Sequence, residues 1–427
     1  MEYIAAGIIL LFAVFGTPLF VIMALAALVA FTFSGVELSA ISIEIYRISS
    51  QATILTIPLF TLAGYLMAES GSPKRLLRLA DAALGWLPGG VAIVSLVICA
   101  FFTAFTGASG VTIIALGGLL YPILNNEGYS EKFSLGLITT SGSLGLLFPP
   151  SLPIILYGLI TGVDIDKLFL AGILPGILLI AILSVYSIVI AKRSRVDKTQ
   201  KLSRKPFSMN ELWLAFRGSI WEVLLPVGVL YGIYSGKTTT TEAAAVTAFY
   251  ILIIEVFVYR DISITKDFPR IIKDSMSLVG GILLILCCAL GFTNWLVDEE
   301  IPMKILAFMQ EYLHSKYSFL FFLNIFLLIV GSLMDIFSAI IVVVPLITPI
   351  AAEFGVDPVH LAIIFLANLE IGYITPPVGI NLFISSFRFK KPVTELYKAS
   401  FPFLLLLLVA LVIITYVPAL SLALVGK

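Results

Sequence analysis

Two Pro-Pro pairs lie inside apolar segments that are otherwise long enough to cross a bilayer. The first lies in the run from Ser141 to Gly158, and the second in the run from Asn368 to Phe383. Proline lacks a backbone N–H and clashes with the preceding turn, so each pair must open its helix. The carbonyl groups freed in this way are costly in hydrocarbon unless they are buried in protein or line a watery cavity. Each break is therefore a candidate cation site.

The two breaks belong to an internal repeat, because Pro149 and Pro376 lie 227 positions apart. Four of the five prolines between Pro122 and Pro175 fall on another proline at this offset. Average composition would give roughly 0.25 such matches. Corresponding broken helices in two halves of a membrane chain point to the binding site of a secondary transporter, built from helix ends and unwound carbonyls.

Composition places the whole chain in a membrane. Of its 427 residues, 60% are hydrophobic and 12% are charged, and the mean hydropathy is +1.09. A soluble domain of this length does not carry such values, so we expect an all-α polytopic protein in a lipid bilayer. The net charge is zero, which gives no basic surface for nucleic acid. The three cysteines lie in apolar segments, so neither a disulfide nor a metal site is expected.

A long apolar run precedes each broken helix. Val91 to Leu124 is interrupted by the small residues of 106–110, and Phe319 to Ile350 is interrupted at 331–335. Small residues halfway along such a run favour a re-entrant hairpin, which enters and leaves on one side of the membrane. One plain crossing follows each broken helix, at 168–191 and at 396–424.

Basic residues set the orientation of the two halves. The linker 192–205 carries seven Lys or Arg and one Asp, so it is predicted to be cytoplasmic and to separate the halves. Arg388, Lys390 and Lys391 are placed inside by the same rule, whereas the matching loop 162–167 holds two Asp and one Lys and is placed outside. The repeats are therefore inverted: the first hairpin opens from the cytoplasm, the second opens from outside, and the C-terminus is periplasmic.

The remaining segments are expected to form a frame. Ser72 as a cap begins a surface helix to Trp86, with Lys74, Arg75 and Arg78 on its wet side, and further surface helices follow Ser208 and Pro302. The expected domains are scaffold helices and a first interfacial arm helix (1–90), the first transport half (91–191), the linker (192–205), scaffold and arm helices (206–316) and the second transport half (317–427).

The hairpin tips and the breaks carry the candidate ligands. Helix ends favour an anion, and unwound carbonyls favour Na⁺. The first cation site is assigned to Gly107, Ser109, Ser141, Gly142, Gly145 and Pro149, and the second to Asp335, Asn368, Gly372, Thr375 and Pro376. The substrate is assigned to Ser109, Ser151, Asp335 and Asn381. Each small residue alone is equally compatible with close helix packing. Their duplication around paired breaks favours the ligand interpretation.

Asp335 and Glu370 are the two acids that the sequence places deep in apolar surroundings. Intramembrane carboxylates are functional by default. Asp335 lies at the second hairpin tip, which favours contact with a cation or the substrate, and a turn-capping role is the competing interpretation. Glu370 aligns with Ser143, so the repeat does not duplicate it, and it could pair with a cation or a lysine.

Other classes of function have little support in the sequence. The two histidines, His314 and His360, lie near segment ends and are predicted to be interfacial, which gives no hydrolytic relay. The chain has no soluble nucleotide-binding domain, so an ATP-driven pump is disfavoured. We therefore expect no enzyme activity.

These motifs resemble the large membrane (M) subunit of tripartite ATP-independent periplasmic (TRAP) transporters. The first half carries FTGASGVTIIALGGLLYPIL, GYSEKF, SLGLLFPPSLPIILYG and LFLAGILPG, and the second carries TTTEAAAV, MDIFSAIIVVVPLITPI, VDPVHLAIIFLANLEIGYITPPVGINLF and FPFLLLLLV. The resemblance spans nearly the whole chain. It departs at the first hairpin tip, where the family commonly has two serines and this chain has Ala108-Ser109.

The resemblance implies an elevator-type transporter in the bacterial inner membrane. It implies Na⁺-coupled import of an organic acid, of the sialic acid or C4-dicarboxylate type, with two or more ions. A periplasmic substrate-binding (P) protein would deliver the acid, and a small four-helix membrane (Q) subunit would widen the scaffold. The alternative is a stand-alone Na⁺/anion symporter with similar hairpins that needs no binding protein.

Overall fold

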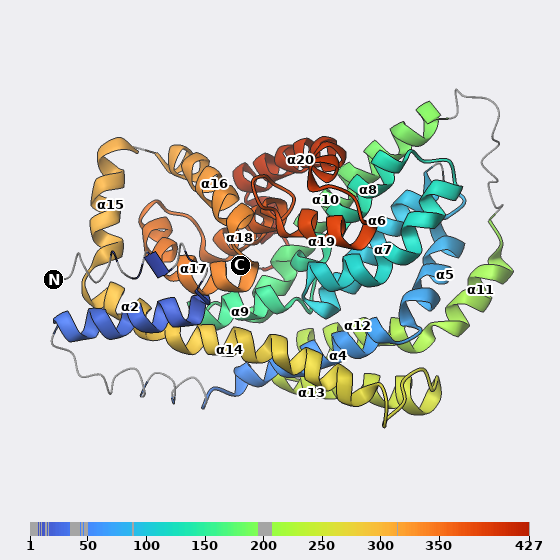
Figure 1. Ribbon diagram of the computed structural model, residues 1–427, viewed down its shortest axis with the longest axis horizontal. Coiled ribbons are helices and arrows are strands. Elements are labelled where there is room, and N and C mark those ends of the chain that lie inside the picture. The colour runs from blue at the N-terminus through green and yellow to red at the C-terminus, as the bar shows by residue number, and fades with distance from the viewer. Residues whose placement is uncertain are drawn as a thin grey trace.

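The computed structural model describes residues 17–34, 50–87, 89–194, 207–313 and 315–426, together with a few single positions before residue 50. Every regular element in these ranges is a helix (Figure 1). Eight of these helices are long and apolar enough to cross a membrane, or up to ten spans if each of two bent pairs counts as one. The predicted all-α polytopic fold is therefore confirmed. Most of the linker and His314 lie outside the described residues.

Both predicted hairpins are present. In the first, α6 (Gly90–Thr106) packs against α7 (Ser109–Asn126), and in the second α16 (Lys316–Leu333) packs against α17 (Ile336–Glu353). Only two residues separate the helices of each pair. The bounds of α7 and α17 differ by the repeat offset at both ends, so the two halves fold alike.

Both broken helices open at their Pro-Pro pairs. The first consists of α8 (Glu131–Ser141), the short turn η2 (Leu144–Leu147) and α9 (Leu152–Thr161), and it bends by 42°. The second consists of α18 (Pro358–Gly372) and α19 (Ile380–Phe389). The Pro149-Pro150 and Pro376-Pro377 bonds are both cis. The closing segments are α10 (Ile165–Ser194), and α20 (Val393–Tyr416) with α21 (Ala419–Leu422).

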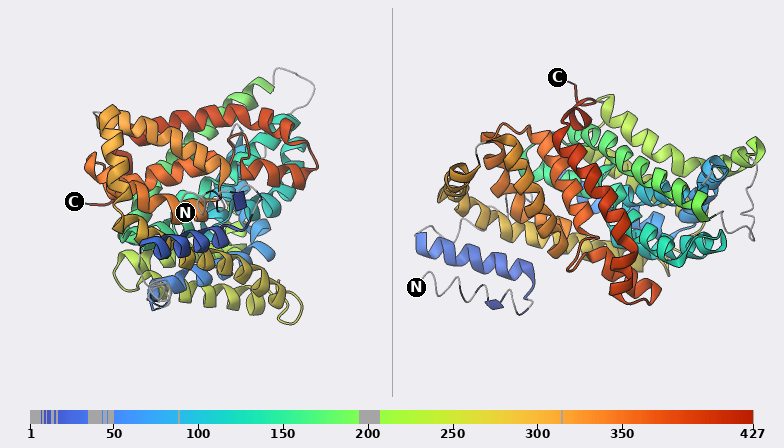
Figure 2. Two further views of the ribbon diagram at one scale, coloured as in Figure 1. Left: turned by 60° about the vertical axis from the view of Figure 1, so that its left-hand side comes forward. Right: turned by 90° about the horizontal axis from the view of Figure 1, so that it is seen from above.

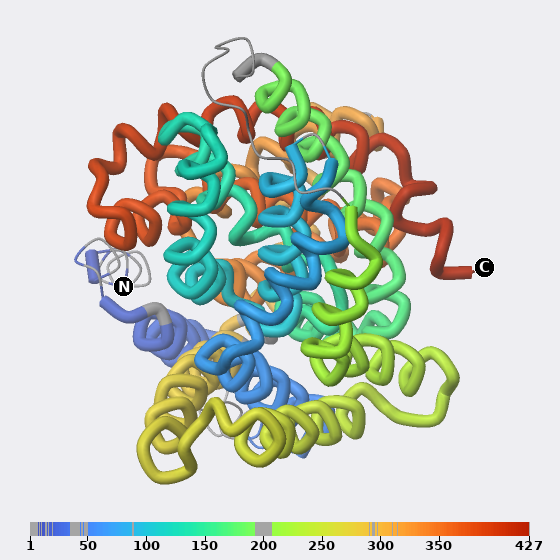
Figure 3. The backbone as a smooth tube through the Cα atoms, turned by 90° about the vertical axis from the view of Figure 1, so that its right-hand side faces the viewer, coloured from blue at the N-terminus to red at the C-terminus, as the bar shows by residue number. Residues whose placement is uncertain are grey.

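The frame helices form a layer on one side of the hairpins and broken helices (Figures 1 and 3). They are α2 (Leu19–Ser34), η1 (Ala52–Leu55), α4 (Thr56–Glu69), α12 (Ile220–Tyr234), α13 (Thr240–Ile253), η3 (Ile254–Val258) and α14 (Phe268–Asp298). α14 packs against α2 and α4, and α13 packs against α4. In Figure 2, α2 lies beside α14 at one edge of the molecule. Among the frame helices, α4 also contacts α6, α7 and α9 of the first half of the repeat, so it lies at the border between the two.

Three amphipathic helices connect the frame to the hairpins and broken helices. α5 (Ser72–Leu84) packs against α6 and α11 (Met209–Gly218), and α15 (Ile301–Tyr312) packs against α14 and α17. The predicted cap at Ser208 is present, because its hydroxyl accepts a hydrogen bond from the Glu211 N–H at 3.3 Å. The predicted cap at Ser72 is wrong. Ser72 is the first residue of α5, and its hydroxyl donates to Glu255 Oε1 at 2.6 Å.

Arg75 on α5 lies among three carboxylates of the frame. Its Nη2 donates to Glu255 Oε2 at 2.9 Å, and its other guanidinium nitrogens contact Glu222 and Asp261. The guanidinium carbon also lies 3.6 Å from the centroid of the Tyr259 ring. Glu222 and Glu255 are fully buried, and the Arg75 side chain is only 19% exposed. The expectation that Arg75 lies on the wet face of its helix is therefore wrong. We call this group the Arg75 cluster.

Hydrogen bonding keeps the Arg75 guanidinium charged. Burial alone would lower its pKa, but hydrogen bonds to Asp261 and Glu222 outweigh burial and hold the pKa above its usual value. The positive charge therefore persists across the physiological pH range and remains available to offset the buried carboxylates.

The polar residues buried within the helices are more numerous than the sequence indicated. Glu222 and Glu255 are buried in addition to Glu370, and neither was among the acids singled out. His360, expected at an interface, is also fully buried. Its ring nitrogens lie 3.1 Å from Ser421 Oγ and 3.1 Å from the Thr415 carbonyl oxygen. His360 therefore ties the start of α18 to the C-terminal segment.

Candidate functional site

The tip of the first hairpin contacts the second half of the chain. Ser109, the first residue of α7, donates a hydrogen bond from Oγ to Asn381 Oδ1 at 2.7 Å. Asn381, the second residue of α19, donates from Nδ2 to the Thr139 carbonyl oxygen at 3.3 Å. Ser109 is 4% exposed and Asn381 is fully buried. One polar connection therefore joins the first hairpin to both broken helices.

Gly107 allows the turn at this tip for two reasons. Its φ of 64° is in the left-handed region, which favours glycine. A Cβ at this position would also come within 2.5 to 2.8 Å of three atoms of the Leu152 side chain at the start of α9. The observed role of Gly107 is thus to let the hairpin turn tightly against the first broken helix.

The tip of the second hairpin is held by its own cap and by the second break. Asp335 Oδ1 accepts hydrogen bonds from the Phe337 and Ser338 N–H groups, both at 3.0 Å, and Oδ2 accepts one from the Ser338 hydroxyl. The Ile336 N–H donates to the Tyr373 hydroxyl at 2.7 Å. Asp335 therefore caps α17, as the competing interpretation held. Its contact with a cation or the substrate stays a prediction.

Close packing accounts for glycine at the first break. The Gly142 carbonyl oxygen accepts a hydrogen bond from Thr103 Oγ1 at 2.7 Å. A Cβ on Gly142 would lie 2.5 Å from Ile113, and a Cβ on Gly145 would overlap the Ala100 carbonyl oxygen. Both glycines thus let the unwound segment lie directly against the first hairpin.

The second break is packed in the same way. A Cβ on Gly372 would overlap Gly331 of α16, so the helices approach there at backbone distance. Thr375 Oγ1 donates to the Ile371 carbonyl oxygen at 2.9 Å, as Ser141 Oγ does to Ile138 at 3.2 Å in the first half. The hydroxyls at both breaks therefore bond to the last turn of their own helix.

Several buried oxygen atoms at the breaks have no hydrogen-bond partner among the described residues. They are Thr140 Oγ1, Ser151 Oγ, Asn368 Oδ1 and both carboxylate oxygens of Glu370. Buried polar atoms are nearly always paired, with protein groups or with bound water or ions. All five lie on the two broken helices. These oxygens are candidate ligands for a cation, and Ser151, whose hydroxyl can also donate, is a candidate contact for a substrate.

The structure brings only some of the predicted site residues together. Ser109, Gly142 and Asn381 gather around the first hairpin tip. Asn368, in contrast, turns toward α16, where its Nδ2 donates to Asn324 Oδ1 at 2.6 Å. Asn368 and Asp335 share no hydrogen bond among those described, so the structure does not join them into one cluster.

Polar residues that the sequence did not single out complete the site. Thr103 Oγ1 and Thr112 Oγ1 lie 2.7 Å apart between the two helices of the first hairpin. Thr139 Oγ1 donates to Ser385 Oγ at 2.9 Å and so links the two broken helices. Tyr373 supports the second tip, as described above. The available signal was weak, because threonine and tyrosine within apolar segments commonly bond to their own helix.

The four residues predicted to contact substrate all stand at the beginning of a helix. Ser109 begins α7, Ser151 is the N-cap of α9, Asp335 is the N-cap of α17, and Asn381 follows the first residue of α19. Helix N-termini carry a partial positive charge, which suits an anion. At α17 the first N–H groups already bond to Tyr373 and to Asp335 itself, so the starts of α7, α9 and α19 are the candidate contacts for a carboxylate.

Known proteins with similar sequences belong to one family of membrane transporters. The chain matches the family described as "Tripartite ATP-independent periplasmic transporter, DctM component" over residues 6–420. It is 39% identical to the C4-dicarboxylate TRAP transporter large permease protein DctM of Pseudomonas aeruginosa, covering 93% of this chain and 92% of that one. It is 36% identical to the isethionate TRAP transporter permease protein DctMQ of Oleidesulfovibrio alaskensis, covering 98% of this chain and 66% of that protein.

A solved structure has a similar fold. The Alcanivorax borkumensis YdaH transporter, whose structure is described as having an unusual topology, aligns with a TM-score of 0.62 over 90% of this chain and 89% of that one. The sequence identity is 13%, so this similarity concerns the fold alone.

Proposed function

Because the chain belongs to the DctM component family of tripartite ATP-independent periplasmic transporters, and is thus a transporter subunit and not an enzyme, we propose that it imports an organic acid across the bacterial inner membrane together with Na⁺. The observation that carries the proposal is that the buried side-chain oxygens of Thr140, Ser151 and Asn368, all on the two broken helices, have no hydrogen-bond partner among the described residues. Thr140 follows Thr139, whose carbonyl oxygen accepts a hydrogen bond from Asn381, the partner of Ser109 across the two halves. Oxygen ligands beside unwound backbone suit Na⁺, and helix N-termini suit the acid.

The substrate class is a small carboxylate or a related anion. The relatives are named for a C4-dicarboxylate and for isethionate, both small organic anions. Ser109, Ser151 and Asn381 supply hydroxyl and amide groups at helix starts, which would hydrogen-bond to such an anion. A C4-dicarboxylate is the first acid to test, and sialic acid is the second. Counterflow into proteoliposomes with a panel of labelled acids would identify the substrate.

Ion binding is proposed to organise the acid site. Ions at the two breaks would fix the hairpin tips, so ion and acid would each strengthen binding of the other. The hairpins and broken helices would then move together against the frame in an elevator motion. Within the frame, a Cβ on Gly64 of α4 would overlap the Phe105 carbonyl oxygen, so the frame and the first hairpin already meet at backbone distance.

Removing a proposed ion ligand should change the Na⁺ dependence of uptake. Ser109→Ala and Asn368→Ala should each raise the Na⁺ concentration for half-maximal uptake by about tenfold, the effect of losing roughly 1.4 kcal/mol of ion binding. Uptake of labelled acid into proteoliposomes over a series of Na⁺ concentrations measures this value. Ser277→Ala is the matched control, because among the residues that the structure describes its exposed hydroxyl bonds only to the Lys273 carbonyl oxygen of its own helix. Unchanged Na⁺ dependence in both variants would contradict the two ion assignments.

A periplasmic binding protein and a small membrane subunit are the proposed partners. The relative named DctMQ extends beyond the part that this chain matches, which supports a second membrane component that is fused there. A stand-alone symporter is the competing function. Uptake of free acid by proteoliposomes that contain this chain alone would favour that competitor, and a requirement for a binding protein would exclude it.

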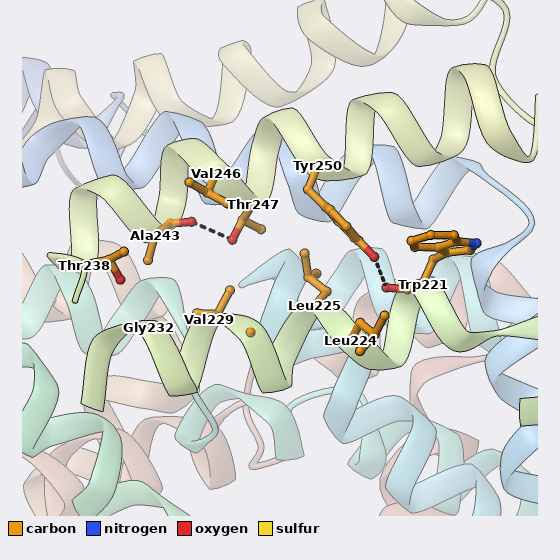
Figure 4. Close-up of a pocket in the computed structure, with 11 residues that line it drawn as sticks. Trp221, Leu224, Leu225, Val229, Gly232, Thr238, Ala243, Val246, Thr247 and Tyr250 are labelled. Carbon is orange, nitrogen blue, oxygen red and sulfur yellow. Dashed lines mark hydrogen bonds between the residues drawn. The ribbon is translucent and has the colours of Figure 1, made fainter. Parts of the chain in front are cut away.

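The groove between α12 and α13 is the proposed contact for the small membrane subunit (Figure 4). It has a volume of about 210 Å³ and is lined mainly by apolar groups of these two frame helices. Gly228 and Gly232 stand four residues apart along it, a spacing that lets a second helix approach closely in a membrane. Tyr250 closes one end by donating to the Trp221 carbonyl oxygen at 2.9 Å.

Filling this groove should separate the partners. Gly228→Leu adds a side chain where no atom lies within 4 Å of the new Cβ, so the subunit itself should fold. We expect copurification with the small subunit to fall at least tenfold, because the added side chain would occupy the position of the approaching helix. Gly281→Leu, at an equally open position on α14, is the control and should leave copurification intact. Equal loss in both variants would argue against this groove.

A further inference from the structure

Glu370 is a buried acid that the proposed sites at the hairpin tips do not use. It lies on α18, two residues before the helix ends at Gly372, and its side chain is fully buried. Neither carboxylate oxygen has a hydrogen-bond partner among the described residues. No ion pair within the described part of the chain involves it either. The protein groups described here therefore leave the carboxylate without a counter-charge.

Glu370 lies where the two halves of the repeat meet. Ser143 Oγ approaches the Glu370 carbonyl oxygen at 3.4 Å, and the two residues are 227 positions apart. That separation is the repeat offset, so the contact joins two equivalent positions. Equivalent positions touch only close to the axis that relates them. Ser143 also lies next to the first break, and η2 packs against α18, so Glu370 is close to unwound backbone.

The environment of Glu370 differs from that of the predicted ligand Asn368. Residues two apart on an α-helix point about 200° apart around its axis. Asn368 donates to Asn324 on α16, so its side chain occupies one face of α18. Glu370 lies on another face. A ligand at Glu370 would thus be separate from one held by Asn368.

A metal ion satisfies this carboxylate more completely than a proton does. An isolated ionised carboxylate is strongly disfavoured in an apolar interior. A proton would remove the charge, but its O–H would lack an acceptor and the other oxygen would still lack a donor. A monovalent metal ion removes the charge and engages both oxygens at once. We propose that Glu370 binds Na⁺ at the axis of the repeat, as an ion additional to those at the two tips.

The test counts ions without using transport. Purified protein in detergent is unfolded by heat over a range of NaCl, with choline chloride holding ionic strength constant and no organic acid present. The rise of Tm per tenfold increase in Na⁺ grows with the number of ions that bind the folded state. Glu370→Gln keeps the shape of the side chain and removes its charge. With two tip ions and one ion at Glu370, this slope should fall by about one third.

Two control variants make the result specific. Glu353→Gln changes an exposed acid at the end of α17 and should keep the wild-type slope. Glu370→Asp keeps the charge but withdraws it by one methylene. The rise of Tm per tenfold increase in Na⁺ should therefore stay as in the wild type, but the Na⁺ concentration at which Tm begins to rise should be several-fold higher. If Glu370→Gln does not yield folded protein, Glu370→Asp decides: a Tm that begins to rise at the same Na⁺ concentration as in the wild type would overturn the proposal.

Other outcomes are equally decisive. An identical Na⁺ slope in Glu370→Gln and wild type would overturn the site. If Glu370→Gln keeps the Na⁺ dependence of Tm but loses the pH dependence of Tm, Glu370 binds a proton and not a metal ion. That result would also overturn the proposed site. Because the measurement requires neither acid nor partner, it can fail while the proposed transport function holds, and it can succeed while that function fails.

Discussion

Replacing Arg75 with alanine should lower the free energy of unfolding by about 3–5 kcal/mol, the usual cost of leaving buried charges without their partner. Glu222 and Glu255 are fully buried, and each bonds to this guanidinium. Ser72 and Tyr259 would remain beside the two carboxylates, but neither carries a positive charge. The variant should therefore unfold at a markedly lower temperature, as measured by intrinsic fluorescence of the purified protein.

The Arg78→Ala variant is the matched control for this prediction. Arg78 lies on the same helix and bonds to Glu211 at 2.8 Å, but both side chains are about half exposed. Exposed ion pairs contribute between 0 and about 1 kcal/mol, so this variant should unfold close to the wild type. Equal destabilisation of the two variants would mean that loss of the arm helix, and not the buried charges, dominates the effect.

Gly145→Ala and Gly372→Ala should each reduce acid uptake at least tenfold, which corresponds to roughly 1.4 kcal/mol or more of lost site organisation. The added methyl group would overlap backbone atoms of Ala100 in one case and Gly331 in the other. Backbone inside a helix cannot move aside as a side chain can, so the broken helix must shift away from its hairpin. Initial rates in proteoliposomes, normalised to inserted protein, measure the effect.

Gly281→Ala separates this close contact from the general preference of helices for alanine. Gly281 lies in α14 with no atom within 4 Å of a new Cβ. Alanine there should keep uptake and add up to about 1 kcal/mol of helix stability. Wild-type uptake in both Gly145→Ala and Gly372→Ala would show that the breaks tolerate a displaced hairpin.

The hairpins and breaks could be predicted from the sequence because their signals are local. A Pro-Pro pair opens a helix wherever it occurs, and Gly107 marks a tight turn within a few residues of chain. The repeat then transferred each local inference to the other half. The helix bounds of the first hairpin, 90–106 and 109–126, lie within two residues of the run 91–124 expected from composition.

The Arg75 cluster could not be predicted in this way. Arg75 meets Glu222, Glu255 and Asp261 across separations of 147, 180 and 186 residues. On its own, α5 has the pattern of a surface helix with a basic face, so the local signal favoured solvent. Arg75 is covered because Glu222 of α12 and Glu255 of η3 reach it from elements far away in the chain. Ion pairs between residues so far apart in the chain produce no periodic pattern of residue types in the sequence.

The candidate site was partly predictable for the same reason. Ser109 and Asn381 were each indicated by their position next to a tip or a break, and the structure joins them across 272 residues. The role of Asp335 was less determined, because capping and ligand binding use the same carboxylate. The threonines Thr103, Thr112 and Thr139 were missed, since a hydroxyl in an apolar helix has several equivalent partners.

The contact between Ser143 and Glu370 bears on how two such halves can become different. In a homodimer built from one half, the residues at this position would be identical and would face each other. Two glutamates there would bring like charges together without solvent, whereas two serines would be tolerated. Once both halves lie on a single polypeptide, each copy of the position mutates independently. An acid can then enter one copy while the other stays small and neutral, so joining the halves permits a chemistry that strict symmetry forbids.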